Sequence, residues 1–234
     1  YELRESDWSS DVCSSDLKFP EVYIPQGNAE EGRIVEQVQV YTPASLQELV
    51  QHLLRPCLQR LVPRTLQEEL AAAGPALDFA EVRGQLVVKR ALEIAAAGGH
   101  NILLEGTPGS GKTMLARRLP SILPPLTEPE ALEVTKIYSI AGLLSTKGRL
   151  VARRPFRSPH HTISCSALAG GGGIPKPGEV TLSHNGVLFL DELPEFSRAA
   201  LEVLRQPLED GFVSISRVQA AYTFPASFLL CASR

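Results

Sequence analysis

Three features are scarce in this sequence: long hydrophobic runs, cysteines at metal-binding spacing, and an excess of charge of one sign. No apolar stretch approaches the roughly 18 residues that a membrane-spanning helix needs, and the polar start contains no signal-peptide core. Cys13, Cys57, Cys165 and Cys231 lie far apart without C-x-x-C spacing, which argues against a zinc site or a disulfide framework. The sequence therefore predicts a cytoplasmic protein without a membrane partner.

The chain has 234 residues, a formal net charge of −3, and a hydrophobic fraction of 44%. This charge balance excludes a protein that binds nucleic acid through its overall charge, so such binding requires a local basic patch. The length and apolar content are enough for one well-packed domain and a smaller piece.

Four segments differ in composition and periodicity. Residues 1–17 are rich in Ser and Asp, lack periodicity and hold the only tryptophan, so we interpret them as non-native or disordered. Residues 18–54 combine valine-rich strand patterns with an S-x-x-E capping box, but about 37 residues are too few for a stable domain. Residues 55–78 form a proline-punctuated linker, and residues 79–234 form the main domain.

Helical and strand patterns alternate along the main domain. The expected helices cover 87–97, 112–119, 127–140 and 198–210, the last one kinked at Pro207, and the expected strands cover 102–104, 187–190, 212–217, 222–224 and 228–231. Strands that alternate with helices predict an α/β fold, a parallel sheet with helices on both faces.

A glycine-rich turn follows the strand expected at 102–104. It reads Gly106, Thr107, Pro108, Gly109, Ser110, Gly111, Lys112 and Thr113, which matches G-x-x-x-x-G-K-[ST] at every fixed position. Such a turn points backbone N–H groups at phosphate oxygens, and the helix N-terminus adds partial positive charge. We expect Lys112 at the β- and γ-phosphates of ATP and Thr113 at Mg²⁺. The alternative, a turn without function, does not explain the Lys-Thr pair.

Two acids follow the apolar strand expected at 187–190. Asp191 and Glu192 would lie at its carboxyl end, where open α/β sheets bind ligands. We expect Asp191 to belong to the Mg²⁺ shell and Glu192 to act as the general base for the water that attacks the γ-phosphate. An apolar run that ends in Asp-Glu is weak alone, and the P-loop earlier in the chain makes it strong.

Several stretches carry a resemblance to one family. They are 79–85 (FAEVRGQ), 156–162 (FRSPHHT), 170–173, 177–179, 184–196 (HNGVLFLDELPEF) and 204–211 (LRQPLEDG). Together they resemble the magnesium-chelatase-like AAA+ ATPases, within them the YifB/ComM branch. The first stretch is similar to the segment that cups adenine in AAA+ ATPases, which implies nucleotide contacts for Val82 and Gly84.

The resemblance implies a P-loop NTPase (AAA+) three-layer core. Residues 18–54 would then be the end of an N-terminal domain similar to the Lon protease fold, and the chain a fragment that stops before the sensor residue and the helical lid. It further implies ATP and Mg²⁺ as cofactors, a homo-oligomeric ring, expected to be a hexamer, and a DNA helicase or branch-migration factor of the ComM type. The alternative is a chelatase-like or chaperone-like ATPase that remodels a protein partner. A peptidase is disfavoured because no Ser-Lys dyad can be located.

The region 147–161 is basic and has no acidic residue. It is a candidate contact for the phosphates of single- or double-stranded DNA, and an ordinary solvated or subunit-facing surface is an equal alternative. For His160 and His161 a hydrogen-bonding or packing role is favoured over a metal site, because no third ligand is near in the sequence. Candidates for an arginine that acts on a neighbouring subunit's γ-phosphate are Arg198, Arg205 and Arg217, and the sequence does not choose among them.

Overall fold

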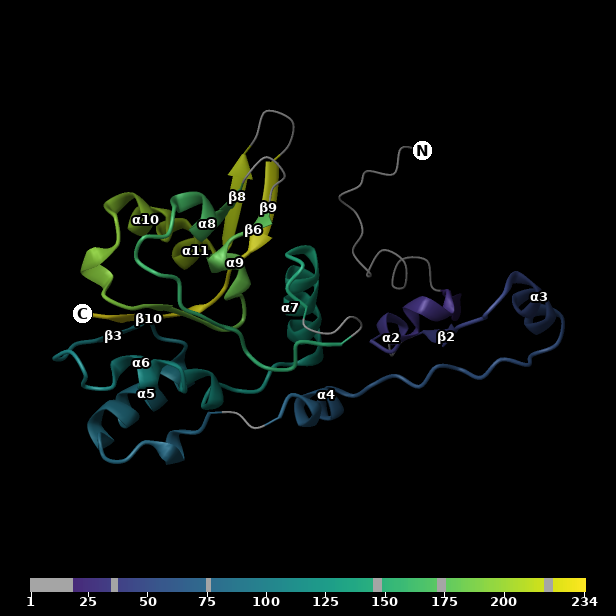
Figure 1. Cartoon of the computed structure of the whole chain (residues 1–234), viewed down its shortest axis with the longest axis horizontal. Helices are drawn as coiled ribbons and strands as arrows, with labels where there is room; N and C mark the ends of the chain where they lie inside the picture. Colours follow the sequence, from purple (N-terminus) through teal and green to yellow (C-terminus); the bar gives the residue numbers. More distant parts are fainter. Residues whose placement is uncertain (1–18, 35–37, 75–76, 145–148, 172–175, 217–220) are drawn as a thin grey trace. The chain divides into compact units, whose positions relative to one another are not determined.

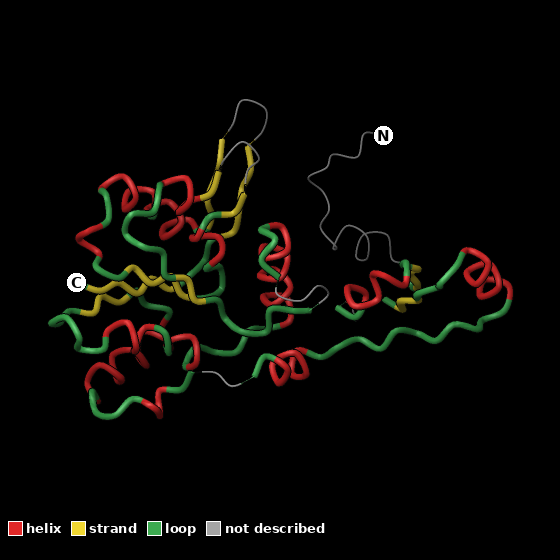
Figure 2. The backbone as a smooth tube through the Cα atoms, viewed as in Figure 1, coloured by secondary structure: helices red, strands yellow, loops and turns green. Residues whose placement is uncertain are grey.

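The computed structural model describes residues 19–34, 38–74, 77–144, 149–171, 176–216 and 221–234 (Figures 1 and 2). The chain divides into two compact units. The smaller comprises residues 1–69 and 145–150, and the larger comprises residues 70–144 and 151–234. The segment 1–17, predicted to be non-native or disordered, lies outside the described residues.

The smaller unit contains a two-stranded parallel sheet and short helices. Its elements are β1 (Glu21–Tyr23), η1 (Gln26–Asn28), α2 (Ala29–Gly32), β2 (Gln39–Tyr41) and α3 (Leu46–Leu54), and α4 (Leu66–Ala72) comes next along the chain. Ser45 begins α3 because its hydroxyl accepts the Glu48 N–H at 3.2 Å. The rings of Tyr23 and Tyr41 stack across the strand pair, with their centroids 5.5 Å apart.

The larger unit is built on a four-stranded parallel sheet. The strand order is β3 (Ile102–Leu104), β10 (Leu229–Ser233), β7 (Val187–Leu190) and β4 (Phe156–Arg157). All three pairings in this sheet are parallel. The predicted α/β class with a parallel sheet is therefore confirmed.

Helices cover both faces of this sheet (Figure 1). One face carries α5 (Leu86–Gly98) and α6 (Lys112–Ala116), and the other carries α8 (Cys165–Ala169), α9 (Glu179–Leu182), α10 (Arg198–Val203) and α11 (Arg205–Asp210). The remaining elements are η2 (Phe79–Glu81), η3 (Leu119–Ser121), α7 (Glu128–Ile140), β5 (Gly170–Gly171), β6 (Lys176–Pro177), η4 (Leu193–Glu195), β8 (Phe212–Ser216) and β9 (Ala221–Pro225). The strands β8 and β9 pair as an antiparallel hairpin.

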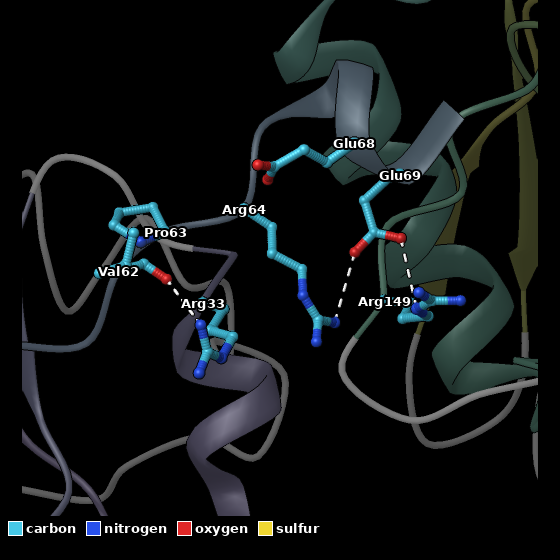
Figure 3. A pocket seen from close by; sticks show the side chains of 7 residues that line it. All are labelled: Arg33, Val62, Pro63, Arg64, Glu68, Glu69 and Arg149. Atoms are coloured by element: carbon cyan, nitrogen blue, oxygen red, sulfur yellow. Dashed lines mark hydrogen bonds and ion pairs between the residues drawn. The ribbon is translucent and has the colours of Figure 1, made fainter. Parts of the chain in front are cut away.

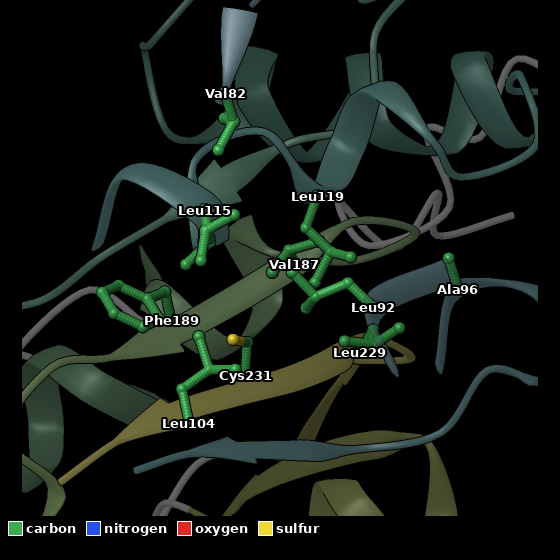
Figure 4. Close-up of a cluster of buried hydrophobic side chains, with 11 residues drawn as sticks. Val82, Leu92, Ala96, Leu104, Leu115, Leu119, Val187, Phe189, Leu229 and Cys231 are labelled. Carbon is green, nitrogen blue, oxygen red and sulfur yellow. The ribbon is translucent and has the colours of Figure 1, made fainter. Parts of the chain in front are cut away.

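Successive side chains of the strand β7 alternate between two hydrophobic cores. Val187 and Phe189 pack into the core on the α5 and α6 face (Figure 4). Leu188 and Leu190 pack into the core on the opposite face. All four are fully buried, because alternate side chains of a strand point to opposite faces and both faces are covered.

Two helices are shorter than predicted, and a proline explains each. The helix expected over 112–119 ends at Ala116, and the helix expected over 198–210 is interrupted at Leu204, three residues before Pro207. Proline lacks the N–H that bonds the carbonyl four residues earlier. Pro120 therefore leaves the carbonyl of residue 116 without its helical partner, and Pro207 does the same to that of residue 203.

Candidate functional site

The glycine-rich turn lies between β3 and α6, at the carboxyl edge of the sheet. Gly109 and Gly111 have backbone φ angles of +78° and +87°, which residues with a Cβ atom rarely adopt. Lys112 is the first residue of α6, and its ammonium donates to the carbonyl of Gly106 at 2.5 Å and to that of Thr107 at 3.1 Å. The loop thus presents a helix N-terminus and an ammonium at one place, as an anion site requires.

Gln85 fixes the turn from outside. Its side-chain amide donates to the carbonyl of Ser110 at 2.8 Å, and its own backbone is left-handed, with φ of +53°. A non-glycine residue in this conformation is costly and persists only where surrounding contacts hold it. Gln85 belongs to the stretch 79–85 that carries the family resemblance, but no role was predicted for it.

Asp191 is tightly held at the end of β7. Its carboxylate accepts the Thr113 hydroxyl at 2.8 Å and also accepts the Ser233 hydroxyl. Partial burial alone would raise the pKa of Asp191, but the hydrogen bonds from Ser233 and Thr113, with the nearby charge of Lys112, outweigh it and lower that pKa below its usual value. The structure therefore brings Thr113 and Asp191 together, as predicted, and the acid is a carboxylate at neutral pH.

Glu192 is oriented differently from Asp191. Its backbone is left-handed, with φ of +55°, and its N–H donates to the Ser233 hydroxyl at 3.1 Å. Its side chain is 69% exposed and lies 3.7 Å from His161, measured from carboxylate oxygen to Nδ1. The Glu192 side chain is therefore largely exposed, whereas the Asp191 carboxylate is bonded to Thr113.

The strands that carry the two motifs are separated by one strand. The sequence placed the acids at the carboxyl end of an apolar strand without giving the strand order, and in the structure β10 lies between β3 and β7. Ser233, the last residue of β10, bridges the gap by bonding Asp191 and the Glu192 backbone. Sequence reasoning missed Ser233. The sequence signal that could have indicated it is an apolar run, the later β10, that ends in the hydroxyl residue Ser233.

A cavity of about 440 Å³ adjoins the glycine-rich loop. It is lined by residues of α5, of β3 and of the loop, among them Val87, Leu103, Thr107 and Lys112, and this volume suits a small organic ligand. Of the predicted nucleotide contacts, Val82 is buried in the core and does not line this cavity, and neither does Gly84.

The basic region 147–161 is largely occupied by internal contacts, and Lys147 lies outside the described residues. Arg154 donates to the carbonyls of Pro124 and Asn185 at 2.5 and 2.7 Å. Arg157 forms a two-pronged pair with Glu179 at 2.6 and 2.7 Å. Arg153 donates to the Gly74 carbonyl.

Arg149 belongs to the smaller unit and lies beside a shallow cavity of about 290 Å³ (Figure 3). Its Nε lies 3.5 Å from the buried carboxylate of Glu69, which also faces Arg64 at 3.6 Å. The two guanidinium groups here pair with a buried acid, which offsets the cost of removing it from water.

The remaining candidates from the sequence are a metal site and three arginines. Among the described residues, no group of three His, Cys, Asp or Glu side chains is placed to hold a metal ion. Arg205 pairs with Glu202 and Glu209, Arg198 begins α10, and Arg217 lies outside the described part of the chain.

The described cysteines are free thiols, and Cys13 lies outside the residues that the structure describes. Burial raises the pKa of Cys231 to about 12, so this thiol is unreactive at neutral pH. None of the helices among the described residues has the length and apolar character to cross a membrane.

Comparison with known proteins relates this chain to one family. The family model described as magnesium chelatase, subunit ChlI, matches residues 78–234. The YifB protein of Salmonella typhimurium is 49% identical over 189 residues, which cover 79% of this chain and 37% of the relative. Competence protein ComM of Haemophilus influenzae is 46% identical over 215 residues, 91% of this chain and 42% of the relative. The chain thus spans about two fifths of each.

A solved structure shares the fold of the larger part of the chain. It is a model of the complex between subunits BchI and BchD of magnesium chelatase, matched with a TM-score of 0.53 and 21% identity, over 68% of this chain and 55% of that one. At this identity the likeness concerns the fold alone. It agrees with the predicted P-loop, AAA+ class.

Proposed function

Because the chain belongs to the magnesium-chelatase ChlI family, with relatives of the YifB and ComM type, we propose that it is the ATP-hydrolysing core of an AAA+ motor. One observation carries this proposal. The hydroxyl of Thr113, from the glycine-rich loop, and the carboxylate of Asp191, from a strand 78 residues later in the chain, meet at 2.8 Å. Two sequence motifs thereby converge on one edge of the sheet.

The residues at this edge fit Mg²⁺ and a nucleoside triphosphate. Thr113 and Asp191 offer a hydroxyl and a carboxylate, the hard oxygen ligands that Mg²⁺ prefers. When bound, Mg²⁺ neutralises charge at the phosphates. Lys112 exchanges its carbonyl partners for phosphate oxygens, and the loop amides bind the rest of the phosphate chain. Glu192, whose side chain is 69% exposed, accepts a proton from the attacking water as general base.

The proposed substrate of the motor is DNA, and the proposed assembly is a ring of identical subunits, a hexamer. A relative that is 46% identical is named competence protein ComM, the type to which the sequence was compared for a DNA helicase function. The arginines of region 147–161 provide the positive charge that a phosphate backbone would need. In this function ATP hydrolysis drives a helicase or branch-migration activity.

One observation favours the second candidate, an ATPase that remodels a protein partner. Arg153, Arg154 and Arg157 are engaged with carbonyls or with Glu179. Phosphates of a DNA strand would have to displace these partners. A protein substrate would not require that exchange.

The deciding experiment measures ATP turnover by the full-length protein, alone and with single- or double-stranded DNA. The matched control is Glu192→Gln, which keeps the shape of the side chain and removes the base. We expect turnover in the wild type, several-fold stimulation by DNA, and loss of at least about 100-fold in the variant. Turnover that does not respond to DNA would favour a protein substrate. Equal turnover in wild type and variant would remove the assignment of the base.

A further inference from the structure

The adjacent residues His160 and His161 lie at the edge of the sheet where Asp191 and Glu192 are found, because of the strand order. They follow β4, which pairs with β7 in parallel, Phe156 opposite Val187 and Arg157 opposite Leu188. Parallel neighbours end at the same edge of a sheet. The residues after β4 therefore lie beside Asp191 and Glu192, which follow β7.

The two histidines have different partners. The Nδ1 of His160 lies 2.9 Å from the hydroxyl of Thr162, its own neighbour in the chain. The Nδ1 of His161 lies 3.7 Å from the carboxylate of Glu192, more than 30 residues away. Only one member of the pair therefore faces the proposed base.

The ring of His161 is held on two sides, whereas Glu192 is not. The ring packs on His160, with centroids 4.0 Å apart, and meets the ring of Phe196 edge-on at 6.5 Å and 80°. Phe196 is itself buried in the core, and the His161 side chain is 29% exposed against 69% for Glu192. A packed imidazole thus lies beside an exposed acid whose side chain has several rotamers available to it.

We propose that His161 is a positioning residue that orients the Glu192 carboxylate toward the attacking water. This inference rests on the proposed ATPase function and adds a residue to it. A base contributes only in a narrow range of geometry, and small misplacements reduce turnover steeply. His161 touches neither nucleotide nor water in this role, and it acts by limiting the rotamers of Glu192.

The segment that carries His161 is anchored from the other side. The bidentate pair of Arg157 with Glu179 ties the end of β4 to α9. A hydrogen bond with Glu179 raises the pKa of Arg157 further above its already high usual value, so the guanidinium of this pair is charged at neutral pH. The segment before the imidazole is therefore tied both to α9 and to β7.

The test replaces each histidine by phenylalanine, which keeps the ring packing and removes Nδ1. ATP turnover and nucleotide affinity are measured for the full-length His161→Phe and His160→Phe proteins, with thermal unfolding as the check of the fold. We expect kcat to fall about tenfold in His161→Phe, with KM and nucleotide Kd within about twofold of wild type. His160→Phe should retain most of its kcat. His161→Asn, whose amide nitrogen can replace Nδ1, should retain more activity than His161→Phe, and it gives the answer if the phenylalanine variant does not fold.

A double mutant separates positioning from a general structural effect. On the Glu192→Gln background, His161→Phe should cause no further loss of turnover, because two residues that act through one group are not additive. The inference is overturned if His161→Phe turns over ATP like the wild type, if His160→Phe loses as much, or if the loss persists on the Glu192→Gln background. A wild-type protein without ATPase activity would instead overturn the proposed function itself.

Discussion

Each end of β7 carries a histidine, a glutamate and a left-handed residue, yet the two ends are held differently. At the amino end, Asn185 has φ of +55°, and the Nε2 of His184 lies 3.2 Å from a carboxylate oxygen of Glu133. At the carboxyl end, Glu192 also has φ of +55°, and its carboxylate lies 3.7 Å from Nδ1 of His161. The chemical groups are the same, so their connections must decide what each end does.

The amino end is closed by bonds to the backbone. His184 is buried, and its Nδ1 accepts the Ser227 N–H at 3.1 Å. The N–H of Asn185 donates to the Ser227 carbonyl at 2.7 Å, and its carbonyl accepts from Arg154 at 2.7 Å. The His184 side chain and the Asn185 backbone thus connect the start of β7 to residues 133, 154 and 227. At the carboxyl end one acid stays exposed, and the ammonium of Lys112 has only loop carbonyls to give up for a ligand.

The variant Lys112→Ala is expected to have the largest effect, and this effect should be confined to the carboxyl end of β7. The change removes the charge at the phosphate loop and leaves the amino end of β7 untouched. We expect nucleotide affinity to fall at least about 100-fold, because a charged contact to phosphate is lost from a site built for it. Equilibrium binding of a fluorescent ATP analogue to the full-length protein measures the effect.

The control for this prediction is Lys89→Ala. Lys89 is also a lysine of the same domain that donates to a backbone carbonyl, that of Val82, but it lies outside the glycine-rich loop. Equal losses of affinity in the two variants would show that the loop charge is not specific for phosphate.

The next largest effect is expected at the amino end, from His184→Phe. The variant leaves the Ser227 N–H without its acceptor and removes one partner of the Glu133 carboxylate, which keeps the Asn185 amide at 3.4 Å. We expect a loss of about 2 kcal/mol in the free energy of unfolding, the cost of breaking such bonds at a buried site. Urea unfolding of the full-length protein measures it.

The matched variant at the other end, His161→Phe, should change the free energy of unfolding by less than about 0.5 kcal/mol. Similar stability losses from both variants would erase the difference between the two ends. In that case the carboxyl end would also be a structural network.

The sequence predicted the parts of the site that depend on local chemistry. The spacing from Gly106 to Thr113 fixes a phosphate loop, because glycines and a helix N-terminus determine its shape within eight residues. The run that ends in Asp191 likewise predicts a buried strand. The strand order was less accessible, since nothing local reveals that β10 inserts between β3 and β7.

Contacts between residues far apart in the chain were less accessible for the same reason. Ser233 was missed, and His161 was assigned a hydrogen-bonding or packing role without a partner. They lie 42 and 31 residues from Asp191 and Glu192, and each meets its acid only because strands end at a common edge. The helix breaks, by contrast, could be predicted from the prolines. Pro120 and Pro207 have no N–H to donate to the carbonyls of residues 116 and 203, four positions earlier. These two residues are the observed ends of α6 and α10.

A smaller effect is expected from Ser233→Ala, which sharpens the description of the carboxyl end. The variant removes one hydrogen bond to the Asp191 carboxylate and the acceptor of the Glu192 N–H. We expect the Mg²⁺ concentration for half-maximal ATP turnover to rise about tenfold, as for other groups that orient metal ligands. Ser233→Thr keeps the hydroxyl and should restore the wild-type requirement. An unchanged Mg²⁺ requirement in the alanine variant would mean that Thr113 alone orients Asp191.

The smallest effect is expected from Thr127→Ala, at the start of α7, the helix whose Glu133 faces His184. The Thr127 hydroxyl caps the helix and lies 3.0 Å from the Glu130 carboxylate, which also accepts the Thr127 N–H. Partial burial would raise the pKa of Glu130, but these bonds and the charge of Arg154 lower it below its usual value.

We expect Thr127→Ala to lower the free energy of unfolding by about 1 kcal/mol at neutral pH. Because the pKa of folded Glu130 is depressed, its stabilising contribution is complete above the usual glutamate value of about 4.3 and is lost as the pH falls through the folded value. The difference between wild type and variant should therefore shrink in urea unfolding below that pH. A difference that stays constant into the acidic range would show that the hydroxyl caps the backbone alone and that the carboxylate takes no part. The amino end would then be held by His184 and Arg154 without help from the helix cap.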